Sequence, residues 1–319
     1  MTIVASWIAS PILSGIISTA TFFFILKCVV QTDEPAWNGL LFLPLFYFLT
    51  LFTNIFPVLL TGSSIIRFRQ FPVWLAFIAA VCLAIGGALF VWFFFVPRLK
   101  FAIQNKVITG RENRRRPNNP VQNTAADLTT STSDINATTS PGGSSTDDEP
   151  EVNELFSPLQ VLTAIFGAFA HGGNDASNAI SPLVTLWVIY RTGSVNERLQ
   201  SPLFLFVFGG VGICVGFWVY GQKVITTVGE KLTKITASNG FSIEFGATAT
   251  ILMASKIGLP ISTTHCKVGS IVCVGYLSNG FGAVNWALLK EISIGWIVTV
   301  LITALLSAAI MTVLKVVLI

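Results

Sequence analysis

Long runs of apolar residues, separated by short polar connections, dominate the pattern of this chain. A membrane-spanning helix needs about 20 predominantly apolar residues. Seven stretches reach or approach that length, and they cover residues 3–30, 39–60, 71–97, 156–190, 202–220, 241–277 and 292–319. The pattern therefore predicts an all-α, polytopic integral membrane protein.

Polar tracts interrupt the fourth and the sixth run. They are residues 171–179, HGGNDASNA, and residues 260–265, PISTTH. Burying an unpaired polar group in hydrocarbon costs roughly 2–7 kcal/mol, so such tracts persist where they line a cavity or bind a solute. We therefore expect discontinuous or re-entrant helices and a transporter. The pattern leaves open whether each broken segment crosses the membrane or turns back as a hairpin.

Composition agrees with a bilayer environment, because 53% of the residues are hydrophobic and only 11% are charged. Between residues 98 and 155 the pattern inverts to polar residues with almost no aromatic side chains, which predicts a disordered loop. This segment begins with a basic cluster, Arg98, Lys100, Lys106, Arg111, Arg114, Arg115 and Arg116. Basic residues near a span end mark the cytoplasmic side.

These features divide the chain into three parts. Residues 1–97 are predicted to form three transmembrane helices, residues 98–155 a cytoplasmic loop, and residues 156–319 a transmembrane region that carries both polar tracts. The first apolar run is longer than the roughly 7–15 apolar residues of a signal-peptide core, so it reads as a retained span. We expect the plasma membrane as the location.

The first polar tract has the composition of a cation site. Gly172 and Gly173 disfavour helix by about 1 kcal/mol each, and we expect the helix to break there. If the chain resumes as a helix, Asn174, Asp175 and Asn178 share one face. Amide and carboxylate oxygens, with carbonyls freed at a helix break, suit Na⁺ or H⁺ coupling. The alternative is an Asp that caps the second half-helix beside polar helix contacts.

The second tract has the composition of an anion site. Pro260 ends one helix, and Ser262, Thr263, Thr264 and His265 supply donors where the next helix begins. Helix N-termini attract anions, so an oxyanion such as phosphate suits this position. The alternative is that these hydroxyls bond to their own backbone or to a neighbouring helix.

Three ionisable residues accompany the tracts, and charge inside a membrane is functional by default. Lys267 is expected to neutralise a bound anion. Lys256 is expected to pair with Glu244 or Asp175, which gives Glu244 and Lys256 a coupling or gating role. Glu244 also lies near a segment end, where an interfacial position is the alternative.

The residues give little support to an enzyme. The sequence contains no recognisable catalytic triad, metal-ligand cluster or phosphate-binding loop, and its only two histidines are His171 and His265. The five cysteines lie in or beside apolar segments, as small buried hydrophobic side chains do. We expect no cofactor, no nucleic-acid partner and no metal beyond transported sodium, with H⁺ as the other candidate cation.

Two stretches around the tracts resemble a known family. The sequences AFAHGGNDASNAI at 168–180 and IGLPISTTHCKVG at 257–269 are similar to those of the inorganic phosphate transporter family, the sodium-phosphate symporters also known as retroviral receptors. Residues 5–15 and 38–62 resemble the family as well. The resemblance thus covers nearly all of the chain outside the loop and matches the C-terminal part of the family pattern.

The resemblance implies a fold of two inverted repeats with substrate and cations held between them. It implies a cation and substrate role for Asn174, Asp175 and Asn178, and a phosphate role for Ser262, Thr263 and Thr264. Glu244 matches a family carboxylate. The chain departs from the family at Gly173, where Ala is usual, and at Lys256, where a neutral residue is more common; a buried ammonium there would stand in for a bound sodium. Each tract occurs once in this sequence.

The combined expectation is sodium-coupled symport of inorganic phosphate by alternating access. Its partners are phosphate, sodium, the lipid bilayer, and a second copy or another chain that supplies the other half of the site. His265 and Lys267 complete the predicted phosphate site. The alternative is a non-transporting fragment or paralog that acts as a half-subunit or in assembly or surface recognition.

Overall fold

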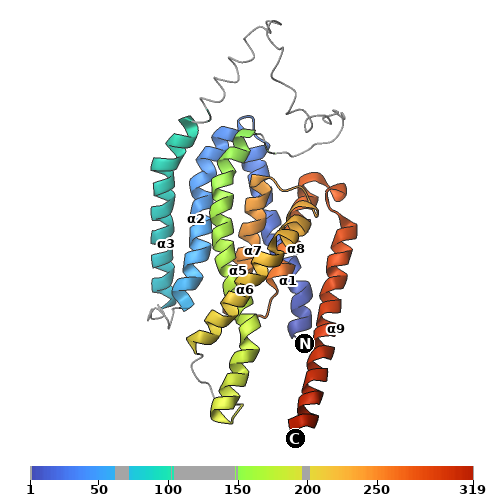
Figure 1. The fold of residues 1–319 in the computed structure, drawn as a ribbon. Helices are drawn as coiled ribbons and strands as arrows, with labels where there is room; N and C mark the ends of the chain where they lie inside the picture. Colours follow the sequence, from blue (N-terminus) through green and yellow to red (C-terminus); the bar gives the residue numbers. More distant parts are fainter. Residues whose placement is uncertain are drawn as a thin grey trace, which may run out of the picture. The chain divides into compact units, whose positions relative to one another are not determined.

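The computed structural model describes residues 2–61, 72–101, 103, 148, 150–195 and 202–318, and this part of the chain is mostly helical. The α-helices (Figure 1) are α1 (Thr2–Ile25), α2 (Pro35–Thr61), α3 (Val73–Phe90), α5 (Pro150–Thr192), α6 (Leu203–Val224), α7 (Ala237–Ile257), α8 (Thr263–Asn279) and α9 (Trp286–Leu318). Short π-helical segments, Leu26–Val30, Val91–Phe95 and Ile225–Glu230, extend α1, α3 and α6, and a 3-10 turn, Phe281–Ala283, precedes α9.

Six helical segments of the described chain are long and apolar enough to cross a membrane. They match six of the predicted runs, and the all-α membrane fold is confirmed. The sixth run, residues 241–277, is different, because it forms two shorter helices, α7 and α8, separated by residues 258–262. That interruption is the discontinuity predicted at the second tract.

The break predicted at the first tract is wrong. α5 continues unbroken from Pro150 to Thr192, a length of 43 residues. A Cβ atom built on Gly172 or Gly173 meets nothing within 4 Å, so neither glycine marks a close approach of another helix. Each glycine lowers the stability of the helix by about 1 kcal/mol relative to alanine, and the helical residues on both sides outweigh this loss.

The loop predicted for residues 98–155 is shorter than expected at both ends. The helical segment that begins with α3 continues to Phe101, and α5 begins at Pro150. Apart from residues 103 and 148, the remainder of that prediction lies outside the described residues.

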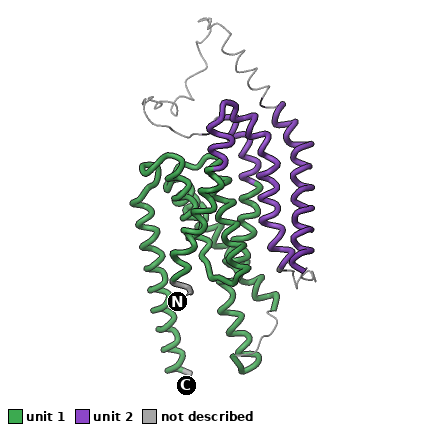
Figure 2. Tube along the Cα trace, turned by 180° about the vertical axis from the view of Figure 1, so that it is seen from behind, with its two compact units in different colours: residues 1–23, 162–319 green, residues 24–161 purple. Residues whose placement is uncertain are grey.

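The chain forms two compact units (Figure 2), residues 24–161 and residues 1–23 with 162–319. In the first of these, α2 and α3 pack against each other. Ala76, Ala80 and Ala84 are fully buried along α3, and such small residues let membrane helices approach closely. The ring of Phe77 meets Phe52 edge to face at a centroid distance of 5.7 Å.

The other unit holds both polar tracts, and its helices approach still more closely. A Cβ atom on Gly246 of α7 would lie 2.6 Å from the backbone nitrogen of Ser18 on α1. A Cβ atom on Gly269 of α8 would lie 2.5 Å from the Cα atom of Pro11. α1 is therefore in backbone contact with both halves of the interrupted sixth run.

Local sequence explains how α7 and α8 begin and end. Asn239 Oδ1 accepts a hydrogen bond of 2.8 Å from the backbone nitrogen of Thr236, which satisfies a donor at the start of α7. Gly258 ends α7 in the left-handed conformation, at φ 76°, which glycine adopts without steric cost. Pro260 follows, and Ser262 caps the start of α8.

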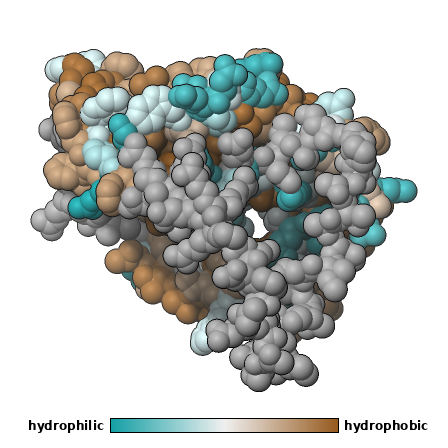
Figure 3. Space-filling view, turned by 90° about the horizontal axis from the view of Figure 1, so that it is seen from above, coloured by the Kyte–Doolittle hydropathy of each residue, from teal (hydrophilic) through white to brown (hydrophobic). Residues whose placement is uncertain are grey.

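Many large hydrophobic side chains of the described residues are exposed, and Figure 3 shows hydrophobic residues near the edges of the face seen from above. The most apolar 18-residue stretch of α9 contains no residue that is buried within the structure. Leu305, for example, is 71% exposed. Lipid tails cover such side chains in a bilayer, whereas monomeric soluble proteins rarely expose contiguous apolar patches of this size. The chain is an integral membrane protein.

The close approach of α1 and α7 predicts a strong effect of one methyl group. Gly246→Ala would push a Cβ atom into the backbone of Ser18, and we expect a loss of about 1–3 kcal/mol of stability, as for other overpacked sites. Gly295→Ala is the matched control, since a Cβ atom at this α9 position meets nothing within 4 Å. Thermal unfolding of the purified chain in detergent measures both, and equal midpoints would contradict the predicted contact.

Candidate functional site: the two polar tracts

The two polar tracts meet through one hydrogen bond. Asp175 lies in the middle of α5, and Thr263 is the first residue of α8. Thr263 Oγ1 donates to Asp175 Oδ1 at 2.8 Å, and the side chain of Thr263 is 94% buried, with 6% exposed. The structure thus joins the predicted cation tract and the predicted phosphate tract side chain to side chain, although 88 residues separate them.

The amides of the first tract lie on one face of α5, as their spacing predicts. Asn178 Nδ2 donates to Asn174 Oδ1 at 3.1 Å, and Asn174 Nδ2 donates to Ser255 Oγ on α7 at 3.3 Å. The capping alternative for Asp175 is wrong, because no helix begins at this position. Asp175 instead accepts from another helix, and its neighbours form a chain of amides that reaches α7.

The second tract divides between two environments. Ser262 Oγ accepts from the backbone nitrogen of His265 at 3.3 Å, and Ser262 O accepts from the nitrogen of Cys266 at 3.1 Å. Thr263 turns to Asp175, whereas Thr264 is exposed. By the geometry of helix starts, the amides of Thr263 and Thr264 have no intrahelical acceptor.

A cavity of about 290 Å³ opens at this helix start. Its volume is near the lower end of small-molecule sites, about 300 Å³. His265 forms one wall, with only 7% of its side chain exposed, and its ring lies 3.8 Å from the ring of Trp296 on α9. The lining residues are Trp7, Ser262, Thr264, His265, Trp296, Thr299 and Val300.

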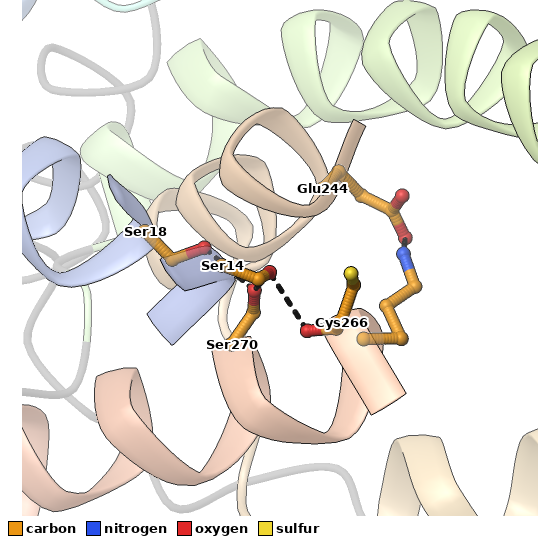
Figure 4. Close-up of polar contacts among 6 residues, drawn as sticks. Ser14, Ser18, Glu244, Cys266 and Ser270 are labelled. Atoms are coloured by element: carbon orange, nitrogen blue, oxygen red, sulfur yellow. Dashed lines mark hydrogen bonds and ion pairs between the residues drawn. The ribbon is translucent and has the colours of Figure 1, made fainter. Parts of the chain in front are cut away.

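The charged residues form one ion pair that the sequence did not predict. Lys267 of α8 forms an ion pair with Glu244 of α7 (Figure 4), and both side chains are mostly buried, with 23% and 22% exposed. Glu244 lies within α7 and is held by this ion pair. The side chain of Lys256 is exposed. The buried ammonium is therefore Lys267, and it meets a carboxylate of the protein.

A serine ladder on α1 supports α8, and sequence reasoning missed it. Ser14 Oγ donates to Cys266 O at 2.8 Å and lies 2.5 Å from Ser270 Oγ, which also receives a hydrogen bond of 2.8 Å from Ser18 (Figure 4). The signal was present in the sequence as a four-residue recurrence in an apolar run, Ser6, Ser10, Ser14 and Ser18. Such spacing puts small polar residues on one helix face.

The sequence profile of the phosphate transporter family matches residues 1–307. The chain belongs to this family. A Danio rerio relative, sodium-dependent phosphate transporter 1-A, is 33% identical over 480 residues, covering 97% of this chain and 74% of the relative. Sodium-dependent phosphate transporter 1 of Homo sapiens is 56% identical over 168 residues, covering 53% of this chain and 25% of the relative.

One solved structure is similar over almost the whole chain. It is described as the sodium-dependent phosphate transporter, and it matches with a TM-score of 0.74 at 32% identity. The match covers 99% of this chain and 66% of the solved one. The chain therefore spans about two thirds of that structure.

The bond between the tracts predicts a difference between two neighbouring threonines. Thr263→Val removes the donor to Asp175, and a partly buried carboxylate without its donor costs about 1–3 kcal/mol. Thr263→Ser keeps the hydroxyl and should retain most of that stability. Thr264→Val, at the exposed neighbour, is the control. Thermal unfolding in detergent without phosphate measures all three, and a Thr263→Val variant as stable as Thr264→Val would rule out the bond.

Proposed function

We propose that this chain takes part in sodium-coupled symport of inorganic phosphate by alternating access. The observation that carries the proposal is the hydrogen bond from Thr263 to Asp175. It links a group that suits a cation to a group that suits an oxyanion. The names of the relatives, sodium-dependent phosphate transporters, support the same substrate and the same coupling ion.

Sodium is bound in this proposal by oxygens of the first tract. Asp175 supplies the charge, and Asn174 and Asn178, which are bonded to each other, supply amide oxygens. Hard oxygen ligands at membrane depth are the usual site of coupling ions in secondary transporters. Transported sodium, with H⁺ as the alternative ion, is the only cation that this mechanism requires.

Phosphate binds in this proposal at the start of α8. The cavity there is small, and it is lined by the hydroxyls of Ser262, Thr264 and Thr299 and by the imidazole of His265. The amides of the first helical turn and the positive end of the helix dipole favour an anion. Binding and release need no covalent chemistry, so we assign no enzymatic reaction to the site.

The coupling follows from the shared hydroxyl. Without sodium, the hydroxyl of Thr263 is committed to Asp175. A cation on Asp175 competes for the same carboxylate oxygen, which releases the hydroxyl to donate to a phosphate oxygen. Each ion thus raises the affinity for the other, as linkage requires.

We place the transporter in the plasma membrane with the segment after α3 on the cytoplasmic side. Arg98 and Lys100 lie at the end of that apolar segment, where basic residues mark the inner face. The ammonium of Lys100 stacks over the ring of Trp37 at 4.4 Å, a pairing typical of the membrane interface.

Uptake of radiolabelled phosphate tests the proposal. Cells that express this chain should take up more phosphate in sodium than in choline medium, with delivery to the cell surface measured in parallel. Sodium-independent or background uptake by surface-delivered protein would overturn transport by this chain and favour a half-subunit that needs another chain.

Asp175→Asn should reduce sodium-dependent uptake to background, because the substitution removes the charge that holds the cation. Ser177→Ala is the matched control on the same tract, since Ser177 Oγ bonds only to the backbone oxygen of Gly173 at 2.7 Å among the bonds found in the described chain. It should leave uptake unchanged. A surface-delivered Asp175→Asn variant with full sodium-dependent uptake would disprove the role of Asp175.

A further inference from the structure

A second group of buried polar side chains lies between α5, α7 and α8, beside the tracts. Its centre is the ion pair between Glu244 and Lys267, and Figure 4 shows Glu244 at this pair. Thr248 lies one turn after Glu244 on α7 and is 1% exposed. Its hydroxyl has no hydrogen-bond partner among the described residues.

The backbone of α5 closes this group on one side. A Cβ atom on Gly167 would lie 3.0 Å from Glu244 Oε2 and 3.1 Å from Thr248 Oγ1. Both oxygens therefore face the same point on α5, where a side chain larger than hydrogen would crowd them. Glycine at this position lets the backbone of α5 approach both oxygens closely.

His171 lies one turn after Gly167 on α5. Its Nε2 atom is buried and has no hydrogen-bond partner within the described chain. The group thus holds one ion pair and one unpaired hydroxyl beside α5, the helix that also carries Asp175.

We propose that the ammonium of Lys267 is a tethered competitor for a second sodium position, formed by the Glu244 carboxylate and the Thr248 hydroxyl. Sodium and ammonium carry the same charge, and both bind hard oxygens. Lys267 is suited to exchange, because its ammonium is a compact point charge on a flexible four-carbon stem. Sodium occupies the position only when Lys267 has moved away.

This inference rests on the proposed function and adds a residue and a cation position to it. An isolated carboxylate inside a membrane protein is costly. When no sodium is bound, Lys267 cancels the charge of Glu244, so the empty transporter can change conformation without an unpaired buried charge. A purely structural ion pair would stabilise the helices in the same way but would not compete with sodium.

Sodium-dependent thermal stability of the purified chain separates these two roles. Unfolding midpoints in detergent are measured at increasing sodium chloride against choline chloride, at constant ionic strength. The variants are Lys267→Met, Lys267→Arg and the double variant Glu244→Gln with Lys267→Met. Lys315→Met, at an exposed lysine of α9, is the control for loss of one positive charge.

We expect Lys267→Met to be less stable than the wild type in choline and to recover in sodium. Half-maximal stabilisation should occur at a sodium concentration about fivefold or more below that of the wild type, the lower range for coupled ligands. Lys267→Arg and Lys315→Met should respond as the wild type does. The double variant should lose the added sodium response, because the carboxylate is gone.

An unchanged sodium response in Lys267→Met, or a double variant that keeps the added response, would overturn the proposal. If Lys267→Met does not fold, Lys267→Gln takes its place. If neither Lys267→Met nor Lys267→Gln folds in sodium while the double variant does, the proposal is also contradicted, because sodium then fails to replace the ammonium. The readout is binding to purified protein, so a chain that takes up no phosphate would refute the proposed function without deciding this one.

Discussion

Polar groups in a membrane protein have no bulk water to satisfy them, and this constraint shapes the unit that holds the two tracts. The start of α8 is a helix end rich in hydroxyls, and such an end is stable only if its donors find acceptors inside the protein. Ser262 provides one from its own side chain, and Asp175 provides another from α5. α1 adds a third support, because Ser14 and Ser18 reach α8 through Cys266 O and Ser270.

Close backbone contact makes these short polar side chains effective. Serine and threonine reach only a few ångströms, so helices joined through them must approach almost backbone to backbone. Gly246 and Gly269 allow α1 to do this on α7 and α8, and Gly167 allows α5 to do it beside Glu244. Small residues and hydroxyls therefore act together in this unit, as they do in other membrane helix interfaces.

The arrangement also explains why the two tracts can respond to each other. Asp175 and Glu244 each hold a proton-bearing group of α8, the hydroxyl of Thr263 in one case and the ammonium of Lys267 in the other. Both partners lie in the first turns of α8. A cation that displaces either partner acts directly on the helix start where the proposed phosphate cavity opens.

The membrane fold could be predicted from the sequence because it depends on local properties. The length of an apolar run decides whether it can span, and the pair Gly258 and Pro260 ends a helix by backbone sterics alone. The three polar residues of the first tract were found by type and spacing. The helix break predicted at the glycine pair 172–173 was wrong, because helix propensity is a weak local preference that the rest of a long helix overrides.

The hydrogen-bond and ion-pair partners of these side chains could not be predicted, because they depend on which helices face each other. The sequence by itself determined which groups are the candidates for the proposed chemistry: Asp175, the hydroxyls at 262–264, Glu244 and the lysines. Only the tertiary structure decided that Glu244 takes Lys267, that Lys256 is exposed, and that Thr263 and Thr264 point to different surroundings. The reason is physical: side-chain type and helix spacing are fixed locally, whereas hydrogen bonds and ion pairs between helices are fixed by the packing that brings distant segments together.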